Sequence, residues 1–386
     1  MYKFLLVIVF NLFLGYSAGS LDSSPRCVTS VTTASGSDAP TGAICRGQLI
    51  FEENFNELNF ARWQHESTLA GGGNWEFQWY SNNRSNSYTN NGILYLRPTL
   101  TNDTIGNPTL TSGVLNIHGG APADQCTNPS FWGCERTGSA NNVLNPIKSA
   151  RVRTVNSFAF RYGRVEVQAR MPAGDWLWPA IWLMPKHNAY GSWPASGEID
   201  LVESRGNLNL VQNGVNIGVE QMGSTLHFGP YPALNAYNTA HFTRNTAPGN
   251  GYNRNFHRFQ LDWTPQNMTF YVDGLQVGFV NAGSGFWDRG GFSQRAPGTE
   301  NPWQYGSVMA PFDQEFYFIL NLAVGGVNYF PDNASNPGGK PWNNQSPQAS
   351  TDFWNGRNQW LPTWRLHQDM SREASLQVDY VKVWAL

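Results

Sequence analysis

The amino-acid sequence predicts an all-β sandwich, and three observations support this fold class. Residues 163–170 alternate small or apolar side chains with polar ones, which is the period of a strand that buries one face. Residues 259–263 and 268–280 are rich in strand-forming residues, and turn signals at 264–267 and 273–274 divide them into two successive hairpins. Long amphipathic helical patterns are scarce, so we expect sheets to pack on each other rather than on helices.

The N-terminal 46 residues are expected to precede the folded domain. Residues 1–19 contain Lys3, an apolar run and an end of small residues, which together are typical of a secretory signal peptide. The run is too short for a membrane anchor, and Asn11 interrupts it. Residues 20–46 form a Ser/Thr-rich leader, and residues 47–386 are within the size of one β-sandwich domain. We therefore expect a secreted, extracellular protein.

The four cysteines fall as two near pairs. Because short loops close at low entropic cost, we predict the disulfides Cys27–Cys45 and Cys126–Cys134 among the three connectivities that four cysteines allow. Metal binding is the alternative, but no histidine accompanies the cysteines at ligand spacing.

Charge and aromatic content restrict the kind of partner. A net charge of -2 with 13% charged residues excludes a strongly electrostatic partner, so we expect neither nucleic acid nor an anionic membrane. Aromatic residues make up 14% of the chain, including 16 Trp. About half of these indoles are expected in the core of a large β fold, and the others are candidates for stacking on sugar rings. Nothing in the sequence suggests more than a monomer.

The strand expected at residues 315–326, EFYFILNLAVGG, is apolar on both faces except at Asn321. This pattern is typical of a central strand that is covered on both sides. We therefore expect Asn321 to be a polar group that faces a cleft.

The stretch SGEIDLVESRG, residues 196–206, carries three carboxylates within six positions. In a flat strand Glu198 and Asp200 share a face, whereas Glu203 points to the other. A β-bulge at Leu201 or Val202 would return Glu203 to the first face, and the sequence therefore predicts three acids in a row. Such crowding of like charges leaves at least one of the carboxyl groups protonated near neutral pH.

Two carboxyl groups on one strand face form the set that a retaining glycosidase uses, at a separation of about 5 Å. Glu198 would be the nucleophile, Glu203 the acid/base, and Asp200 the neighbour that adjusts their ionisation. The alternative is an acidic strand that merely faces solvent. The surrounding indoles favour a sugar site over a solvated surface. They are Trp176, Trp178, Trp182 and Trp193.

SGEIDLVESRG resembles the active-site strand of family-16 glycoside hydrolases, specifically the laminarinase-like endo-β-1,3-glucanases and their animal glucan-recognition relatives. The resemblance covers residues 47–386. Other stretches that resemble this family are GDWLWPAIWLMP, STLHFG, LNLAVGG and VDYVKVW. The resemblance implies a β-jelly-roll sandwich with a concave substrate cleft, a β-1,3-glucan polysaccharide as partner, and no cofactor for catalysis.

The resemblance also implies substrate-binding roles for residues beyond the acids. Trp178 and Trp182 match the family's aromatic platform, and His227 matches a histidine near the aglycone sugar. We also expect Asn321, the polar residue of the central strand, to bind substrate. The alternatives are that Trp182 belongs mainly to the core and that His227 is structural.

Three further positions match family features in the outer parts of the chain. Arg84 and Asn86, in the polar loop WYSNNRSNSYTNNGILYL, match residues that reach the glycone side, and a turn-forming loop is the alternative. A glycan at the sequon of Asn83 would crowd the cleft there. Further sequons begin at Asn102, Asn267, Asn333 and Asn344. Asp379 matches a position that helps to hold a structural calcium, with an ordinary edge-strand acid as the alternative.

Two functional classes follow. The first is a secreted retaining endo-β-1,3-glucanase that acts on laminarin-type β-glucans. The second is a non-hydrolytic β-1,3-glucan-binding recognition protein. Relatives of the second class typically lose one or both catalytic glutamates, and this chain has both. Many also carry an extra N-terminal glucan-binding domain of about a hundred residues, for which the leader leaves no room. Both observations favour the enzyme.

Overall fold

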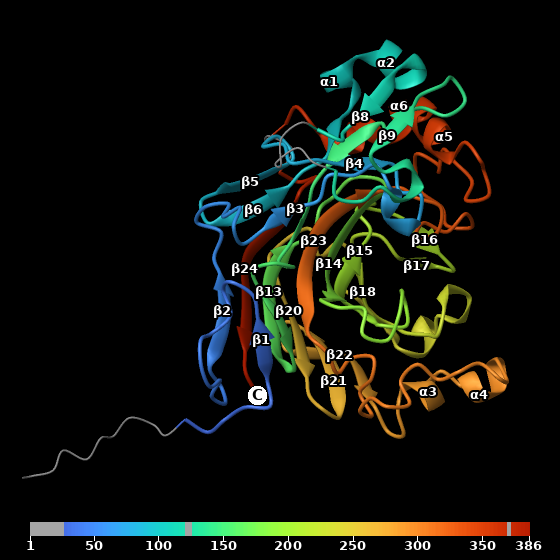
Figure 1. The fold of residues 1–386 in the computed structure, drawn as a ribbon. Helices are drawn as coiled ribbons and strands as arrows, with labels where there is room; N and C mark the ends of the chain where they lie inside the picture. The colour runs from blue at the N-terminus through green and yellow to red at the C-terminus, as the bar shows by residue number, and fades with distance from the viewer. Residues whose placement is uncertain (1–26, 120–125, 369–371) are drawn as a thin grey trace, which may run out of the picture.

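The computed structural model describes residues 27–119, 126–368 and 372–386, so the predicted signal peptide lies outside the described residues. Two antiparallel sheets lie face to face, with short helices and loops gathered at their ends (Figure 1). The predicted all-β sandwich is confirmed. In the described residues, no helix is long and apolar enough to cross a bilayer.

The first sheet carries the predicted acidic strand near its middle. Its path is β1 (Thr33–Ser35), β12 (Ala159–Arg161), β23 (Phe316–Val324), β14 (Leu177–Pro185), β15 (Glu198–Ser204), β18 (Gln221–His227) and β19 (His241–Asn245). Outside this path, β11 (Arg151–Arg153) pairs with β23, and β3 (Gln64–His65) pairs with β11.

The second sheet covers the back of the first. Its path is β22 (Leu275–Asn281), β21 (Asn267–Val272), β20 (His257–Trp263), β13 (Gly163–Arg170), β24 (Leu376–Trp384), β6 (Ile93–Leu96) and β5 (Ser87–Asn90), with β2 (Leu49–Glu53) paired to β24. The two predicted hairpins are β20–β21 and β21–β22. The alternation of β13 is confirmed, because Val165, Val167 and Ala169 are fully buried while the intervening side chains are not.

The core lies between the two sheets and is rich in aromatic rings. Phe51 of β2 stacks on Phe158 at 4.4 Å, and Phe160 packs edge-on against Trp263 of β20 at 5.5 Å. Strand β23 is buried along its whole length, as predicted for a central strand. Burial of these apolar faces, at about 25 cal/mol per Å², is what holds the sheets together.

Smaller elements extend the two ends of the sandwich (Figure 1). One end holds α1 (Asn102–Ile105), α2 (Asn107–Ser112), β8 (Val114–Asn116), β9 (Glu135–Thr137), α5 (Ala349–Asn355) and α6 (Arg357–Trp364). The other end holds α3 (Phe286–Arg289) and α4 (Phe292–Arg295). The remaining short elements are β4 (Gln78–Tyr80), β7 (Thr99–Leu100), β10 (Ile147–Ser149), β16 (Val211–Gln212), β17 (Val215–Asn216), η1 (Gly71–Gly73), η3 (Ser130–Trp132), η4 (Pro232–Leu234) and η5 (Tyr237–Thr239).

Both predicted disulfides, Cys27–Cys45 and Cys126–Cys134, are present. Residues 27–46 are attached to the domain, because β1 pairs with β12 and Ser30 donates a hydrogen bond to the backbone oxygen of Leu386. The described part of the predicted leader is therefore integrated into the sandwich.

Candidate active site

Strand β15 contains the predicted bulge. Asp200 lies opposite Thr225 and Glu203 opposite Gly223, so Leu201 and Val202 together oppose the single residue between those partners on β18. The hydroxyl of that residue, Ser224, donates to the Leu201 carbonyl at 2.7 Å. Because the extra residue changes the alternation, both Leu201 and Val202 are buried. The bulge returns Glu203 to the face of the sheet that carries the other two acids.

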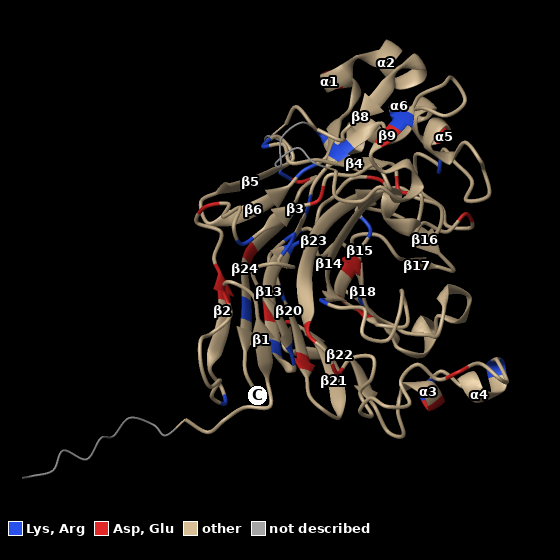
Figure 2. Ribbon diagram, viewed as in Figure 1, with Lys and Arg blue, Asp and Glu red and all other residues tan. Residues whose placement is uncertain are grey.

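The carboxyl groups of β15 perturb one another. Burial raises the pKa of Asp200 well above its usual range, and the charges of Glu198 and Glu203 raise it further. Burial also raises the pKa of Glu203, against a hydrogen bond from Trp178 that lowers it. Figure 2 shows acidic residues on β15, whereas charges of both signs are scattered over the two sheets. Burial and mutual repulsion thus make Asp200 and Glu203 easier to protonate than free carboxyl groups.

His227 on β18 faces the same acids. Its Nε2 lies 3.1 Å from Asp200 Oδ2 and 4.0 Å from Glu198 Oε1. Burial alone would lower the pKa of His227, but the charges of Glu198 and Asp200 outweigh it and raise the pKa to about 9. A protonated imidazole therefore offsets the negative charge of the acidic row at neutral pH. Asn235 and Tyr237 contact the other side of the ring.

Two indoles hold the outer carboxylates of the row. Trp193 donates from Nε1 to Glu198 Oε2 at 2.6 Å, and Trp178 donates to Glu203 Oε1 at 2.8 Å. The two N–H groups orient the carboxyl groups from opposite ends of the strand. Beside Glu203, a small pocket opens between β18, β19 and Tyr329. Its lining includes Arg205, Gln221, His241 and Thr243.

Comparison with known proteins places this site in a family. Residues 130–296 match the family model described as glycosyl hydrolases family 16. A beta-1,3-glucan-binding protein of Penaeus monodon is 50% identical over 341 residues, which cover 88% of this chain and 90% of that protein. The chain belongs to glycosyl hydrolase family 16. Beta-1,3-glucan-binding protein 1 of Manduca sexta is 35% identical over 350 residues. The match covers 89% of this chain but only 66% of that longer protein.

Two solved structures share the fold. The endo-beta-1,3-glucanase from Pyrococcus furiosus superposes with a TM-score of 0.52 at 22% identity, covering 88% of this chain and 94% of that one. The laminarinase from Rhodothermus marinus superposes with a TM-score of 0.50 at 21% identity, covering 88% of this chain and 97% of that one. These likenesses support the predicted family-16 jelly-roll sandwich.

The two tryptophans that the family-16 resemblance offers as a sugar platform are less free than expected. Trp178 is only 8% exposed, and Tyr329 stacks on its ring at 4.0 Å. Trp182 donates to the Asn321 side-chain oxygen at 2.7 Å, and Arg151 lies over its ring at 4.6 Å. The register Asn321–Ala180–Glu203 places Asn321 on the sheet face of the acids, where Trp182 engages its side chain. In this structure Trp178 mainly positions Glu203, because too little of its ring is exposed for a sugar to stack on.

The structure separates Arg84 and Asn86 from the acidic row. Arg84 lies over Phe60 and contacts His65 of β3, and β11, β23 and β14 separate β3 from β15. Asn86 is completely buried. Its amide donates to the oxygens of Arg97, Thr99 and Lys148. The prediction that Asn86 binds substrate therefore disagrees with its position, because a buried amide with three acceptors holds the loop together instead. Asn83, the sequon residue beside them, is exposed.

The sequence indicated Trp193 as one of the indoles near the acids, but it did not indicate the contacts that the loop residues make in the site. Trp193 precedes Glu198 by five residues, but its indole reaches the carboxylate only through the fold of the intervening turn. Tyr329 follows the central strand and covers Trp178. Glu76 is a buried carboxyl group. Burial raises its pKa, and the charge of Glu203 raises it further. The aromatic content of the loops was a signal, but a single sequence does not tell which loop folds over which strand.

Three potential metal-donor groups lie close together in the acidic row. In the described residues, Glu198, Asp200 and His227 bring one potential ligand atom each within 4.8 Å of one another. A metal requires a neutral imidazole, whereas the pKa of His227 is about 9, so the proton competes with a metal at neutral pH. Asp379 on β24 joins no group of three such side chains in the described part of the chain. The structural calcium at Asp379 stays a prediction.

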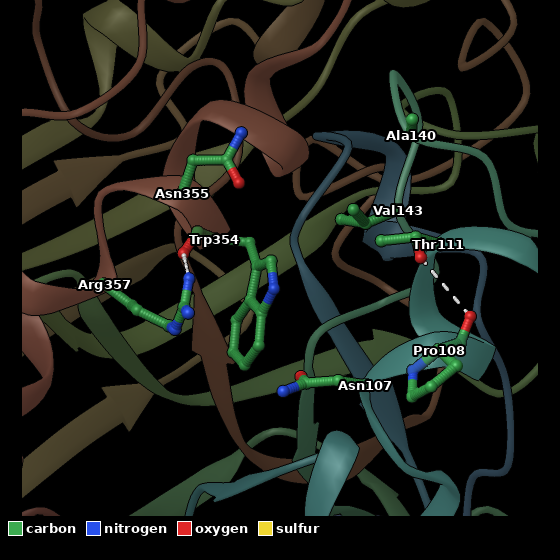
Figure 3. A pocket seen from close by; sticks show the side chains of 8 residues that line it. All are labelled: Asn107, Pro108, Thr111, Ala140, Val143, Trp354, Asn355 and Arg357. Carbon is green, nitrogen blue, oxygen red and sulfur yellow. Dashed lines mark hydrogen bonds between the residues drawn. The ribbon is translucent and has the colours of Figure 1, made fainter.

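A larger pocket lies away from the acidic row, between α2, α5 and the loop at residue 140 (Figure 3). It has a volume of about 400 Å³. The lining residues are Asn107, Pro108, Thr111, Ala140, Val143, Trp354, Asn355 and Arg357. This lining contains no carboxyl group and no imidazole, so it cannot perform acid/base hydrolysis of a glycoside.

Proposed function

We propose that this protein is a secreted, retaining endo-β-1,3-glucanase that hydrolyses laminarin-type β-glucans. The observation that carries the proposal is the complete row of acids on β15, with Glu198 held by Trp193 and Glu203 by Trp178. The names of the Penaeus monodon relative and of the Pyrococcus furiosus structure support a β-1,3-glucan as the substrate. No cofactor enters the proposed chemistry.

The chemistry has two steps. Glu198 attacks the anomeric carbon while Glu203 donates its proton to the glycosidic oxygen, which leaves with the bonding electrons. The ionised Glu203 then takes a proton from a water molecule, and this water attacks the same carbon and releases Glu198. Two inversions leave the product in the β configuration. The raised pKa of Glu203 supports its role as the acid, because the proton must be present before the leaving group departs.

Secretion is part of the proposal. It rests on the signal-peptide pattern of residues 1–19 and on the cysteines, all of which are disulfide-bonded. Disulfides persist mainly in oxidising compartments outside the cytosol. This agrees with a polysaccharide substrate that is met outside the cell.

A second candidate is a non-hydrolytic β-1,3-glucan-binding protein. The printed names of the relatives from Penaeus monodon and Manduca sexta favour it, because both are called glucan-binding proteins. The same cleft would then hold the polysaccharide without cleavage. The two candidates differ in a single observable, which is the appearance of new reducing ends.

The test is release of reducing sugar from laminarin by the purified protein, beside Glu198→Gln and the surface control Glu300→Gln. We expect the parent and the control to be active and Glu198→Gln to lose at least about 1000-fold in kcat, because the nucleophile is gone while the side-chain volume is kept. NMR of the first product should show the β anomer. Near-normal activity of Glu198→Gln, or an α product, would contradict the mechanism. No release by any of the three proteins, with laminarin still bound, would establish the binding protein instead.

A further inference from the structure

Three aromatic side chains outside the acidic row are exposed on two neighbouring loops. Trp75, Phe131 and Trp132 are 48%, 53% and 70% exposed. Trp75 contacts Phe131 edge-on, with ring centroids 5.5 Å apart, and Trp132 follows directly in the chain. We call these three residues the aromatic rim. A single exposed aromatic residue needs no explanation, but a contacting group is typical of a binding surface.

The backbone of the rim is unusual. The φ angles of Trp75, Phe131 and Trp132 are 51°, 54° and 57°, in the left-handed region that bulky residues rarely adopt. The other aromatic residues with positive φ in the described chain are buried, and packing accounts for them. They are Phe55, Tyr162 and Trp176. The rim residues gain no comparable burial from this conformation, and unfavourable backbone angles at an exposed site indicate a function.

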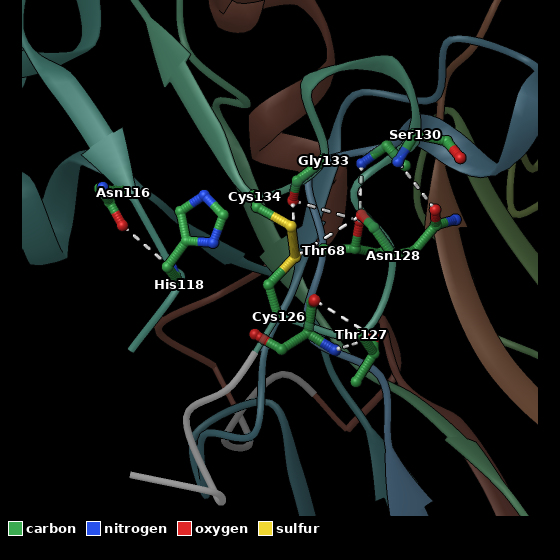
Figure 4. Close-up of a disulfide and its surroundings, with 11 residues drawn as sticks. Thr68, Asn116, His118, Cys126, Thr127, Asn128, Ser130, Gly133 and Cys134 are labelled. Carbon is green, nitrogen blue, oxygen red and sulfur yellow. Dashed lines mark hydrogen bonds between the residues drawn. A yellow bond between two sulfur atoms is a disulfide. The ribbon is translucent and has the colours of Figure 1, made fainter. Parts of the chain in front are cut away.

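The loop that carries Phe131 and Trp132 is fixed in place (Figure 4). The disulfide Cys126–Cys134 closes it, and Thr68 donates a hydrogen bond to the backbone oxygen of Asn128 at 2.8 Å. At Gly133 a Cβ atom would lie 2.1 Å from the same oxygen, so only glycine fits this close approach. A rigid platform loses little conformational entropy when a ligand binds.

The rim adjoins the acidic row through its other loop. Asn74, directly before Trp75, accepts hydrogen bonds from the backbone and a side chain of the 327–329 segment at 2.9 and 3.0 Å. Tyr329 of that segment stacks on Trp178, whose indole donates a hydrogen bond to Glu203. A continuous set of contacts therefore runs from the rim to the acid/base residue.

We propose that the aromatic rim binds the apolar faces of sugar rings in a neutral β-glucan chain that extends beyond the cleft. Indole and phenyl rings offer flat apolar faces, and a pyranose ring offers the matching surface. Polar side chains near the rim on these loops, Asn74, Asn128 and Ser130, are uncharged and suit a neutral polysaccharide. The guanidinium of Arg136, which contacts the rim, is engaged by the Phe131 backbone oxygen at 2.9 Å. The inference rests on the proposed function for the identity of the glucan, but not on hydrolysis.

The test is binding of particulate, insoluble β-1,3-glucan in the Glu198→Gln background, which removes cleavage from the measurement. Adding Trp75→Ala and Trp132→Ala is expected to raise the Kd for the particles about tenfold, because tryptophans in contact surfaces carry much of the binding energy. The Kd for laminaritriose, held by the cleft, should change far less. Tyr305→Ala removes an aromatic side chain that is 93% exposed outside the rim and serves as the matched control. Thermal unfolding of each variant checks that it is folded.

The possible results separate the rim from the cleft. An unchanged Kd for the particles overturns the rim proposal, and so does an equal loss for particles and laminaritriose, which would mean distortion of the cleft. Light scattering that shows a dimer broken by Trp132→Ala, with unchanged glucan binding, would make the rim a protein interface and also overturn it. A parent that binds particles through the rim but releases no sugar would overturn the glucanase alone.

Discussion

The protonation of His227 gives the most specific prediction about pH. Its imidazole lies among carboxyl groups, and the pKa rises from 6.5 to about 9. At about 1.4 kcal/mol per pH unit, this difference corresponds to about 3 kcal/mol of folding free energy. Below about pH 6.5 the imidazole is protonated in the folded and unfolded states, and the contribution is complete. As the pH rises toward 9 the unfolded state has lost its proton and the folded state still holds one, so the contribution declines and disappears above that pKa.

The perturbation is His227→Gln, which keeps a polar side chain and removes the charge. Urea unfolding of parent and variant, at several pH values from 6 to 10, measures the difference in the free energy of unfolding. We expect the parent to be more stable by about 3 kcal/mol near pH 6, and the difference to shrink as the pH rises above about 6.5 and to vanish above about 9. NMR titration of the ring protons measures the pKa directly. A pKa at or below 6.5, or a stability difference that does not depend on pH, would refute this reasoning.

Two further predictions test the acid/base residue and the core. Trp178→Phe removes a hydrogen bond that lowers the pKa of Glu203, so the basic limb of the pH–activity profile should move up by about one pH unit. Trp182→Phe is the control: the indole of Trp182 donates to the Asn321 amide oxygen instead, so this variant should leave the basic limb in place. Val167→Ala, at a fully buried site between the sheets, should cost about 2 kcal/mol in urea unfolding, whereas exposed Val215→Ala should cost less than about 0.5 kcal/mol.

The parts of the fold that depend on local pattern could be predicted from the sequence. The alternation of β13 and the hairpins β20–β21 and β21–β22 appear as expected, because burial of one strand face imposes a period of two. The bulge at Leu201 and Val202 was also predictable, since it alone returns Glu203 to the face of the other acids. These features are encoded within one or two neighbouring strands.

Features that depend on distant loops could not be predicted. The stacking of Tyr329 on Trp178 joins residues far apart in the chain, and it covers a ring that the sequence suggested would be free for sugar. Asn86 was expected in the cleft because its loop resembles a family-16 segment that reaches the glycone side, but that loop folds inward and its amide donates to three acceptors. Hydrophobic period carries no information about such contacts, because loops have no repeating pattern.

The position of β24 has a consequence for synthesis of the protein. This strand, residues 376–384, lies in the interior of the second sheet, between β13 on one side and β2 and β6 on the other. It is also the last described strand to leave the ribosome. Until this strand inserts, the second sheet remains in two unjoined halves with open edges, so the sandwich closes only when β24 joins them. The nascent chain must therefore be protected from pairing with other chains until the final strand inserts.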